Sequence, residues 1–236
     1  MSRTLRYGVI GTGMMGVEHI NNLLVLDGAE VVALCDPDSG SLEAARSLVP
    51  DSACFDDHES MLSAGGLDAL VVATPNSTHV DVLLDVVETG IPVLVEKPLC
   101  TTVTDCLRVI EAAGPSAMVW VGLEYRYMPA VAGLIDSVAP GTVGPVRMVA
   151  IREHRFPFLE KVGGWNRFNR NTGGTLVEKC CHFFDLMNLI TGARPVRVVA
   201  SGAQDVNHLD EEYDGQVPDI IDNAYVIVDF DSGARG

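Results

Sequence analysis

The chain has 236 residues, 47% of them hydrophobic, and a mean hydropathy of +0.23, so it can build a substantial core in one large domain or two smaller ones and is not expected to be disordered. Its formal net charge is −16, with only 16 lysines and arginines, and this field repels nucleic-acid phosphates and anionic membranes. No apolar stretch approaches the roughly 18 residues that span a bilayer, and the start of the chain has no signal-peptide core, so we predict a cytoplasmic address.

Six cysteines, at positions 35, 54, 100, 106, 180 and 181, include no C-x-x-C pair. Most of them lie in hydrophobic runs such as VVALC. They are interpreted as small core residues of a protein in a reducing compartment.

The first half of the chain alternates apolar runs with amphipathic stretches. Residues 4–10, 30–35, 67–74, 91–96 and 117–123 are rich in β-branched side chains, which is typical of strands covered on both faces. Helical patterns separate them at 14–27, 40–48, 57–64, 77–89 and 102–113. This rhythm predicts an α/β fold, a doubly wound parallel sheet of the Rossmann type.

The rhythm changes near residue 120, and we expect domains at 1–122 and 123–236. The second domain is predicted to be α+β with an open, mainly antiparallel sheet: a helix at 127–138, an alternating strand at 146–154, a polar loop at 155–172, a helix after Gly173 and Gly174, and strands at 196–204 and 223–230. Asp231-Ser232-Gly233 is a hairpin-turn signal with little sequence after it. We therefore expect the second sheet to be incomplete and the chain to be a fragment.

The stretch YGVIGTGMMG contains Gly11, Gly13 and Gly16 in the pattern G-x-G-x-x-G, between a predicted strand and a predicted helix. The first glycine permits a tight turn, the second lets a pyrophosphate approach the backbone, and the third lets the helix pack closely. The helix N-terminus attracts the phosphates. A dinucleotide site is predicted at these glycines and at the intervening residues Thr12, Met14 and Met15.

Asp36 follows the second predicted strand, about 20 residues after the glycines. Its carboxylate can accept hydrogen bonds from both ribose hydroxyls and repels a 2′-phosphate, and no arginine follows it, so NAD is preferred over NADP. An S-adenosylmethionine enzyme could share a glycine-rich turn and an acidic strand tip, but its spacing differs.

Two further strand ends carry polar residues. In an open parallel sheet the ligand cleft lies beyond the carboxyl ends of the strands, so these residues are expected to line one cleft with the glycines. A lysine at the end of a buried strand favours a functional role over a structural ion pair with Glu96, whereas His79 fits a backbone-bonded helix residue equally well. The predicted cleft residues are Thr74, Pro75, Asn76, His79, Glu96, Lys97 and Pro98.

The motifs GTGMMG, CDPD, TPNSTH, EKP, EYRYMP and GGTLVEKCCHFFD, in this order, resemble the Gfo/Idh/MocA family of NAD(P)-dependent oxidoreductases across essentially the whole chain. The resemblance implies an N-terminal Rossmann domain, a C-terminal α+β domain whose open sheet often mediates homo-oligomerisation, and a length well beyond 300 residues. It also implies that Arg126 reaches the cofactor side of the cleft, although Arg126 could equally form a salt bridge.

On one helix, Glu178, His182 and Asp185 would form a single stripe. Cys180, Cys181 and His182 would point about 100° apart, so no metal site is predicted. In the family the pattern is Gly-Gly…Asp-x-x-x-His-x-x-Asp, and its histidine serves proton transfer with the EKP lysine. The resemblance therefore implies catalytic roles for Lys97, His182 and Glu178, with Glu178 departing from the family's aspartate, which puts the substrate contact made there in doubt.

The predicted activity is hydride transfer between nicotinamide and a carbinol or ketone carbon, with His182 or Lys97 handling the proton. The predicted loop at 155–172 mixes aromatic and hydrogen-bonding groups, which suits a sugar, a cyclitol or a related polyol. Substrate contacts are expected from Lys97, Trp165, Asn169, Glu178 and His182, although Trp165 could instead be a core anchor. The alternatives are a non-catalytic dinucleotide-sensing protein on the same scaffold and an enzyme that recycles tightly bound NAD.

Overall fold

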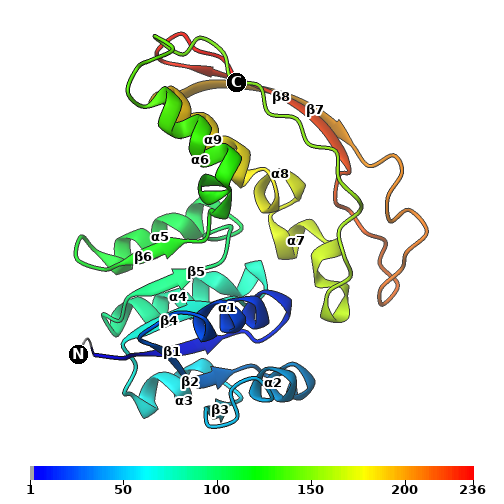
Figure 1. Cartoon of the computed structure of the whole chain (residues 1–236). Coiled ribbons are helices and arrows are strands. Elements are labelled where there is room, and N and C mark those ends of the chain that lie inside the picture. The colour runs from blue at the N-terminus through cyan, green and yellow to red at the C-terminus, as the bar shows by residue number, and fades with distance from the viewer. Residues whose placement is uncertain (1–2) are drawn as a thin grey trace. The chain divides into compact units, whose positions relative to one another are not determined.

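The computed structural model describes residues 3–236. The chain forms two compact units that divide between Gly122 and Leu123, and each is described by itself (Figure 1). No helix within residues 3–236 is long and apolar enough to cross a membrane.

The first unit is built on a six-stranded parallel sheet in the order β3-β2-β1-β4-β5-β6. This is the predicted doubly wound arrangement, and the strand order reverses direction between β1 and β4, where such sheets bind ligands. The sequence missed β3, because three residues are too few to show a periodicity. The strands are β1 (Leu5–Ile10), β2 (Ala29–Cys35), β3 (Ala53–Phe55), β4 (Ala69–Val72), β5 (Val93–Val95) and β6 (Val119–Val121).

Helices cover both faces of this sheet. Three of them begin at residues whose side chains accept a hydrogen bond from the first turn: Asp38 from Ser41 N, Asp57 from Ser60 N and Thr102 from Asp105 N. The helices are α1 (Met14–Leu24), α2 (Ser39–Arg46), α3 (His58–Ala64), the 3-10 turn η1 (Asn76–Thr78), α4 (His79–Glu88) and α5 (Val103–Ala113).

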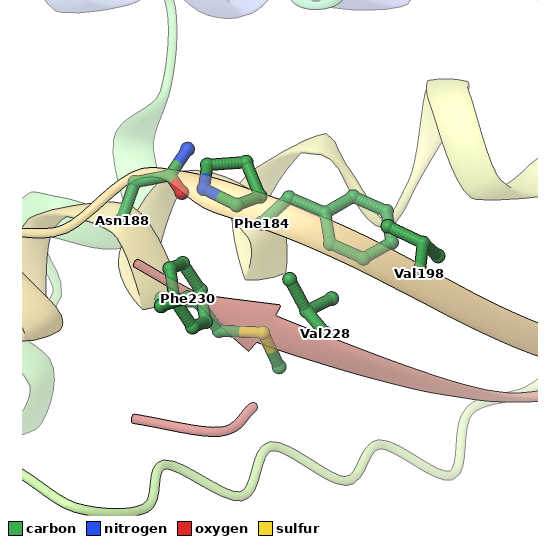
Figure 2. A pocket seen from close by; sticks show the side chains of 7 residues that line it. Phe184, Asn188, Val198, Val228 and Phe230 are labelled. Carbon is green, nitrogen blue, oxygen red and sulfur yellow. The ribbon is translucent and has the colours of Figure 1, made fainter. Parts of the chain in front are cut away.

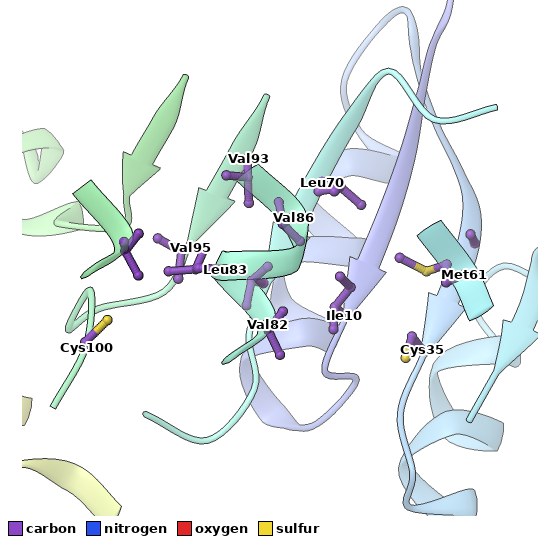
Figure 3. Close-up of a cluster of buried hydrophobic side chains, with 13 residues drawn as sticks. Ile10, Cys35, Met61, Leu70, Val82, Leu83, Val86, Val93, Val95 and Cys100 are labelled. Carbon is purple, nitrogen blue, oxygen red and sulfur yellow. The ribbon is translucent and has the colours of Figure 1, made fainter. Parts of the chain in front are cut away.

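Successive strand residues enter two separate hydrophobic cores, as the alternation of side chains along a strand requires. Val9 packs with Ile20 of α1, whereas the next residue, Ile10, packs with Leu83 of α4 on the other face. Figure 3 shows this second cluster, in which Val82, Leu83 and Val86 of α4 lie against the strands. The two cores fix the strand tips from which the candidate cofactor residues project.

The second unit combines helices with one antiparallel ladder between β7 (Pro195–Ala203) and β8 (Asn223–Phe230). The helical segments are η2 (Glu124–Tyr127), α6 (Pro129–Val138), η3 (Val162–Arg167), α7 (Asn169–Thr172), α8 (Thr175–Glu178) and α9 (Cys181–Thr191). Two of them, η3 and α7, lie where the sequence predicted only loop.

The predicted strand at 146–154 is wrong for the described chain. The backbone of this segment pairs with Arg235 through an isolated bridge at Met148. In this bridge Val149 N donates to Arg235 O at 2.9 Å and Arg235 N donates to Arg147 O at 3.1 Å. Alternating polarity shows that a segment can pair as a strand, but a strand forms only where a ladder of partners is present.

The predicted turn at Asp231-Ser232-Gly233 is confirmed. Gly233 N donates to Phe230 O at 2.9 Å and Phe230 N donates to Ala234 O at 3.0 Å, and Gly233 has a φ of +81°. The positive φ explains the glycine. After the turn, Gly236 and Val228 exchange two backbone hydrogen bonds of 2.8 Å.

Candidate functional site

The glycine loop connects β1 to α1 and meets the tip of β4. Gly11 has a φ of +88°, and a Cβ there would lie 2.6 Å from the Ala73 carbonyl carbon and from Thr74 N. A Cβ at Gly16 would lie 2.0 Å from Gly11 O. Both glycines are therefore required by close backbone approach within the fold.

Gly13 differs from its two neighbours, because a Cβ there would meet nothing within 4 Å. It is the N-cap residue of α1 and offers no side chain to cap the helix. The N–H groups of a helix's first turn favour a phosphate. The space beside Gly13 thus fits the pyrophosphate of a dinucleotide, and Thr12, Met14 and Met15 flank it.

Asp36 is held at the tip of β2 beside this loop. Its Oδ2 accepts hydrogen bonds from Thr12 N at 2.7 Å and Thr12 Oγ1 at 3.2 Å, and its Oδ1 accepts one from Asp38 N at 2.9 Å. These bonds orient the carboxylate while leaving lone pairs on both oxygens. The residues present fit the ribose of NAD.

His79 joins the tips of two strands. It is fully buried, with Nδ1 2.8 Å from Pro98 O and Nε2 3.0 Å from Thr74 O. Burial lowers the pKa of His79, although its backbone hydrogen bonds oppose this effect. The His79 side chain, which was predicted to contact the cofactor, is thus bonded to main-chain carbonyls, and it fixes Thr74 and Pro98 relative to each other. Pro75 and the buried Asn76 follow Thr74 in the chain.

Glu96 is buried next to Lys97 and is paired with a residue that the sequence analysis did not single out. His19 Nε2 lies 2.8 Å from Glu96 Oε1, and Lys97 N donates to Glu96 Oε2 at 3.2 Å. Burial would raise the pKa of Glu96, but the hydrogen bond with His19 and the charges of His19 and Lys97 outweigh burial, so the pKa is lowered. The available signal for His19 was its place three residues after Gly16, one turn into α1.

In the second unit, His182 is 2% exposed. Its ring stacks on Tyr125 of η2, with centroids 4.3 Å apart and planes 10° from parallel, and its Nε2 lies 3.4 Å from Glu124 Oε2. The motif EYRYMP therefore supplies two groups that touch the predicted acid/base. From the sequence, only Arg126 was singled out in that motif.

The single helix predicted after Gly174 is wrong: α8 ends at Glu178 and α9 starts at Cys181. Cys180 N donates to Thr175 O, five residues back, instead of continuing the four-residue pattern. Glu178 and His182 are both buried, but the i, i+4 spacing no longer places them on one helical stripe. A two-residue turn at Lys179 and Cys180 separates the two helices.

The two adjacent cysteines have separate surroundings. Cys181 Sγ donates to Glu178 O at 3.4 Å, and burial raises the pKa of the Cys180 thiol. All six cysteines are free thiols. The group of potential metal ligands that residues 3–236 do bring together, His58, Glu59 and Asp85, lies on α3 and α4.

Other predicted contacts are engaged in structural bonds. Arg126 forms a two-point ion pair with Asp185, with Nε donating to Oδ2 at 2.6 Å, and this pairing raises the pKa of Arg126. Asn169 donates from its backbone and its side chain to Asp219, at 2.6 and 2.8 Å. Trp165 is partly buried in η3, and its carbonyl accepts a hydrogen bond from Asn171.

The structure thus assembles two constellations. Gly13, Asp36, Thr74 and the Glu96-Lys97 pair belong to the first unit, and Glu178 and His182 belong to the second.

An apolar cavity of about 250 Å³ lies in the second unit between α9 and the β7–β8 ladder. Figure 2 shows Phe184, Val198, Val228 and Phe230 around it, with Asn188 at its edge. Its lining contains none of the predicted site residues, and Met187, Val228 and Phe230 also form the core of this unit.

Two family models match the chain. A model described as "Oxidoreductase family, NAD-binding Rossmann fold" matches residues 5–123, and one described as "Oxidoreductase family, C-terminal alpha/beta domain" matches residues 135–236.

Curated relatives are similar to the chain over part of their length. The scyllo-inositol 2-dehydrogenase (NAD(+)) of Bacillus subtilis is 30% identical over 241 residues, covering all of this chain and 67% of the relative. Inositol 2-dehydrogenase 1 of Saccharopolyspora erythraea is 38% identical over 145 residues, or 60% of this chain and 43% of the relative. The matched stretches therefore span 67% and 43% of the lengths of these two relatives.

Among solved structures, that of a probable dehydrogenase from Thermotoga maritima matches with a TM-score of 0.82 and 26% identity, covering 98% of this chain and 67% of that one.

Proposed function

The chain belongs to the Gfo/Idh/MocA family of oxidoreductases, and from this we propose that it is an NAD-dependent dehydrogenase or reductase acting on CH–OH groups of a cyclitol, a sugar or a related polyol. The observation that carries the proposal is the open space at Gly13 at the start of α1, in a chain 30% identical over its whole length to a scyllo-inositol 2-dehydrogenase (NAD(+)).

NAD would supply the hydride chemistry at its nicotinamide C4. The first unit would bind and orient it: Gly13 and the start of α1 at the pyrophosphate, and Asp36 at the adenosine ribose. The carboxylate of Asp36 disfavours a 2′-phosphate, which supports a preference for NAD over NADP. Met14, Met15, Thr74, Pro75 and Asn76 would line the same cleft.

Proton handling is assigned to Lys97 and His182. Lys97 follows β5, and its backbone is held by the buried carboxylate of Glu96; its ammonium would hold the substrate oxygen and stabilise alkoxide charge. His182, buried and stacked on Tyr125, would exchange the hydroxyl proton. Glu178, Trp165 and Asn169 would contact the substrate from the second unit, and Arg126 would act from the cofactor side.

The test is a turnover screen on the purified chain with inositols, hexoses, deoxysugars and sugar acids, using NAD and NADP side by side and following NADH absorbance. With an accepted substrate, Lys97→Ala and His182→Ala are expected to lower kcat by about 10²–10⁴-fold while NADH binding is retained. The matched controls are Lys161→Ala and His154→Ala, which alter a lysine and a histidine outside these positions.

Three outcomes contradict parts of the proposal. Wild-type turnover that survives in both variants removes Lys97 and His182 from the chemistry. NAD binding without turnover of any substrate class points to a dinucleotide-sensing protein, and NAD that stays bound through gel filtration points to internal recycling.

We also propose that the protein forms a homo-oligomer and acts in the cytoplasm. Exposed apolar side chains on the β7–β8 ladder support oligomerisation, since Val196 is 64% exposed and Tyr225 80% exposed. Light scattering after size exclusion distinguishes a monomer from an oligomer.

A further inference from the structure

Tyr125 contacts two residues of the turn that separates α8 from α9. Its ring stacks on His182 at 4.3 Å, and its hydroxyl forms a hydrogen bond with Lys179 Nζ. Lys179 Nζ also lies 4.5 Å from the centroid of the same ring. One aromatic side chain of η2 thus joins an ammonium and an imidazole that are three residues apart in the sequence.

Lys179 is well placed to hold Tyr125 still. Its side chain is 13% exposed, and Nζ lies 3.3 Å from Glu153 Oε1 and 5.9 Å from the centroid of the Phe183 ring. A lysine with a carboxylate, a hydroxyl and two aromatic faces as partners is confined to one position. Lys179 is the C-cap residue of α8: its N–H still donates to Thr175 O at 2.9 Å, and the helical pattern breaks at the next residue, Cys180.

We propose that Tyr125, anchored by Lys179, is a positioning residue for His182: the ring fixes the plane of the imidazole, and the ammonium favours the uncharged imidazole that can accept a substrate proton. This inference rests on the proposed function and adds roles for Tyr125 and Lys179. All the contacts that it uses lie within the second unit.

Charge on His182 is set by several neighbours. On η2 these are Glu124, Tyr125 and Arg126. The others are Glu178 at the end of α8, Lys179 in the turn, Asp185 on α9, and Glu153, which pairs with Lys179. Arg126 and Asp185 neutralise each other. Glu124 at 3.4 Å favours imidazolium, whereas Lys179 opposes it, with part of its charge offset by its ion pair with Glu153 at 3.3 Å. Lys179 Nζ lies 4.5 Å and the imidazole centroid 4.3 Å from the centroid of the Tyr125 ring. The ammonium and the imidazole are therefore at most roughly 9 Å apart, a distance at which a unit charge still affects protonation of the imidazole.

The first measurement needs no substrate. NMR titration of the His182 ring, assigned with His182→Gln, is expected to show a higher midpoint in Lys179→Met than in wild type, by a few tenths of a pH unit, and a lower midpoint in Glu124→Gln. Lys161→Met is the control and should leave the midpoint unchanged. An unchanged midpoint in Lys179→Met overturns the role of the ammonium, whatever the enzyme's substrate.

The second measurement is kinetic. Tyr125→Phe keeps the stacked ring but loses the anchor, whereas Lys179→Met loses both the anchor and the ammonium. Each is expected to lower kcat about fivefold or more with KM for NAD unchanged, and the double variant should be no worse than Lys179→Met alone, because both changes break the same contact between Tyr125 and Lys179. Tyr125→Leu, which loses the ring, is expected to lower kcat more than tenfold. Tyr225→Phe is the control.

The failures are distinguishable. Absence of turnover in wild type counts against the proposed function and leaves the NMR result as the test of this inference. Wild-type turnover with additive effects of Tyr125→Phe and Lys179→Met, or none, refutes the positioning role.

Discussion

Gly13→Ala is expected to separate cofactor binding from folding, because the three glycines of the loop have different surroundings. A methyl group at Gly13 meets no protein atom within 4 Å, whereas one at Gly11 would lie 2.6 Å from the backbone at Ala73 and Thr74. Gly13→Ala and Gly11→Ala therefore each add one methyl group, at positions two residues apart. The first is expected to affect cofactor binding, and the second is expected to affect folding.

The magnitudes follow from the backbone. Gly13 has a φ of −67°, which alanine adopts without strain, so a small capping loss and a smaller unfolded-state entropy nearly cancel and stability changes by less than about 1 kcal/mol. Gly11 has a φ of +88°, which costs alanine about 1–2 kcal/mol, and the overlap adds about 1–3 kcal/mol. At Gly13 the methyl group overlaps no protein atom but occupies the space proposed for the pyrophosphate.

The assays are thermal unfolding and calorimetric titration with NADH. Gly13→Ala should unfold within a few degrees of wild type and bind NADH at least 100-fold more weakly, a loss of about 2.7 kcal/mol. Gly11→Ala should unfold well below wild type. Retention of wild-type NADH affinity in Gly13→Ala would refute the assignment of the pyrophosphate to this loop, and a loss of stability equal to that of Gly11→Ala would refute the steric reasoning.

Three further predictions concern charges. Asp36→Ser should narrow the proposed preference for NAD over NADP about tenfold or more in calorimetric titrations, since it removes both an acceptor and a repulsive charge; an unchanged ratio of the two affinities counts against this role of Asp36. His19→Leu leaves the buried Glu96 carboxylate without its partner and should cost about 1–3 kcal/mol in urea unfolding at neutral pH, whereas no change would mean that the pair is not formed. Burial raises the pKa of Glu211, but hydrogen bonds from His208, Arg167 and Tyr213 outweigh burial and lower the pKa to about 2. The contribution of Glu211 to stability is therefore present above the ordinary pKa of 4.5 and is lost as pH falls toward 2. Glu211→Gln should flatten the dependence of the free energy of unfolding on pH between these values.

The first unit was readable from the sequence because each of its signals is local. Strand runs, amphipathic stretches and the spacing of three glycines all depend on residues close in the chain. The parallel sheet and the tips carrying Asp36 and Lys97 follow from them. The omission of β3, with three residues, marks the limit of periodicity.

The second unit was harder to read because its features depend on partners distant in sequence. Nothing in EYRYMP indicates that Tyr125 stacks on His182, 57 positions away, and the pattern GGTLVEKCCHFFD gives no warning of a turn at Lys179. Alternating polarity at 146–154 predicts a strand, but a strand forms only where a partner segment pairs with it. The buried partner of Glu96, His19, was missed for the same reason.

The position of His79 also has a consequence for protein engineering. Because its ring lies between the carbonyls of Thr74 and Pro98, we expect that replacing only one of the loops after β4 and β5 by that of a relative would misplace one of these contacts. A graft that aims to change specificity would have to transfer both segments together with this histidine.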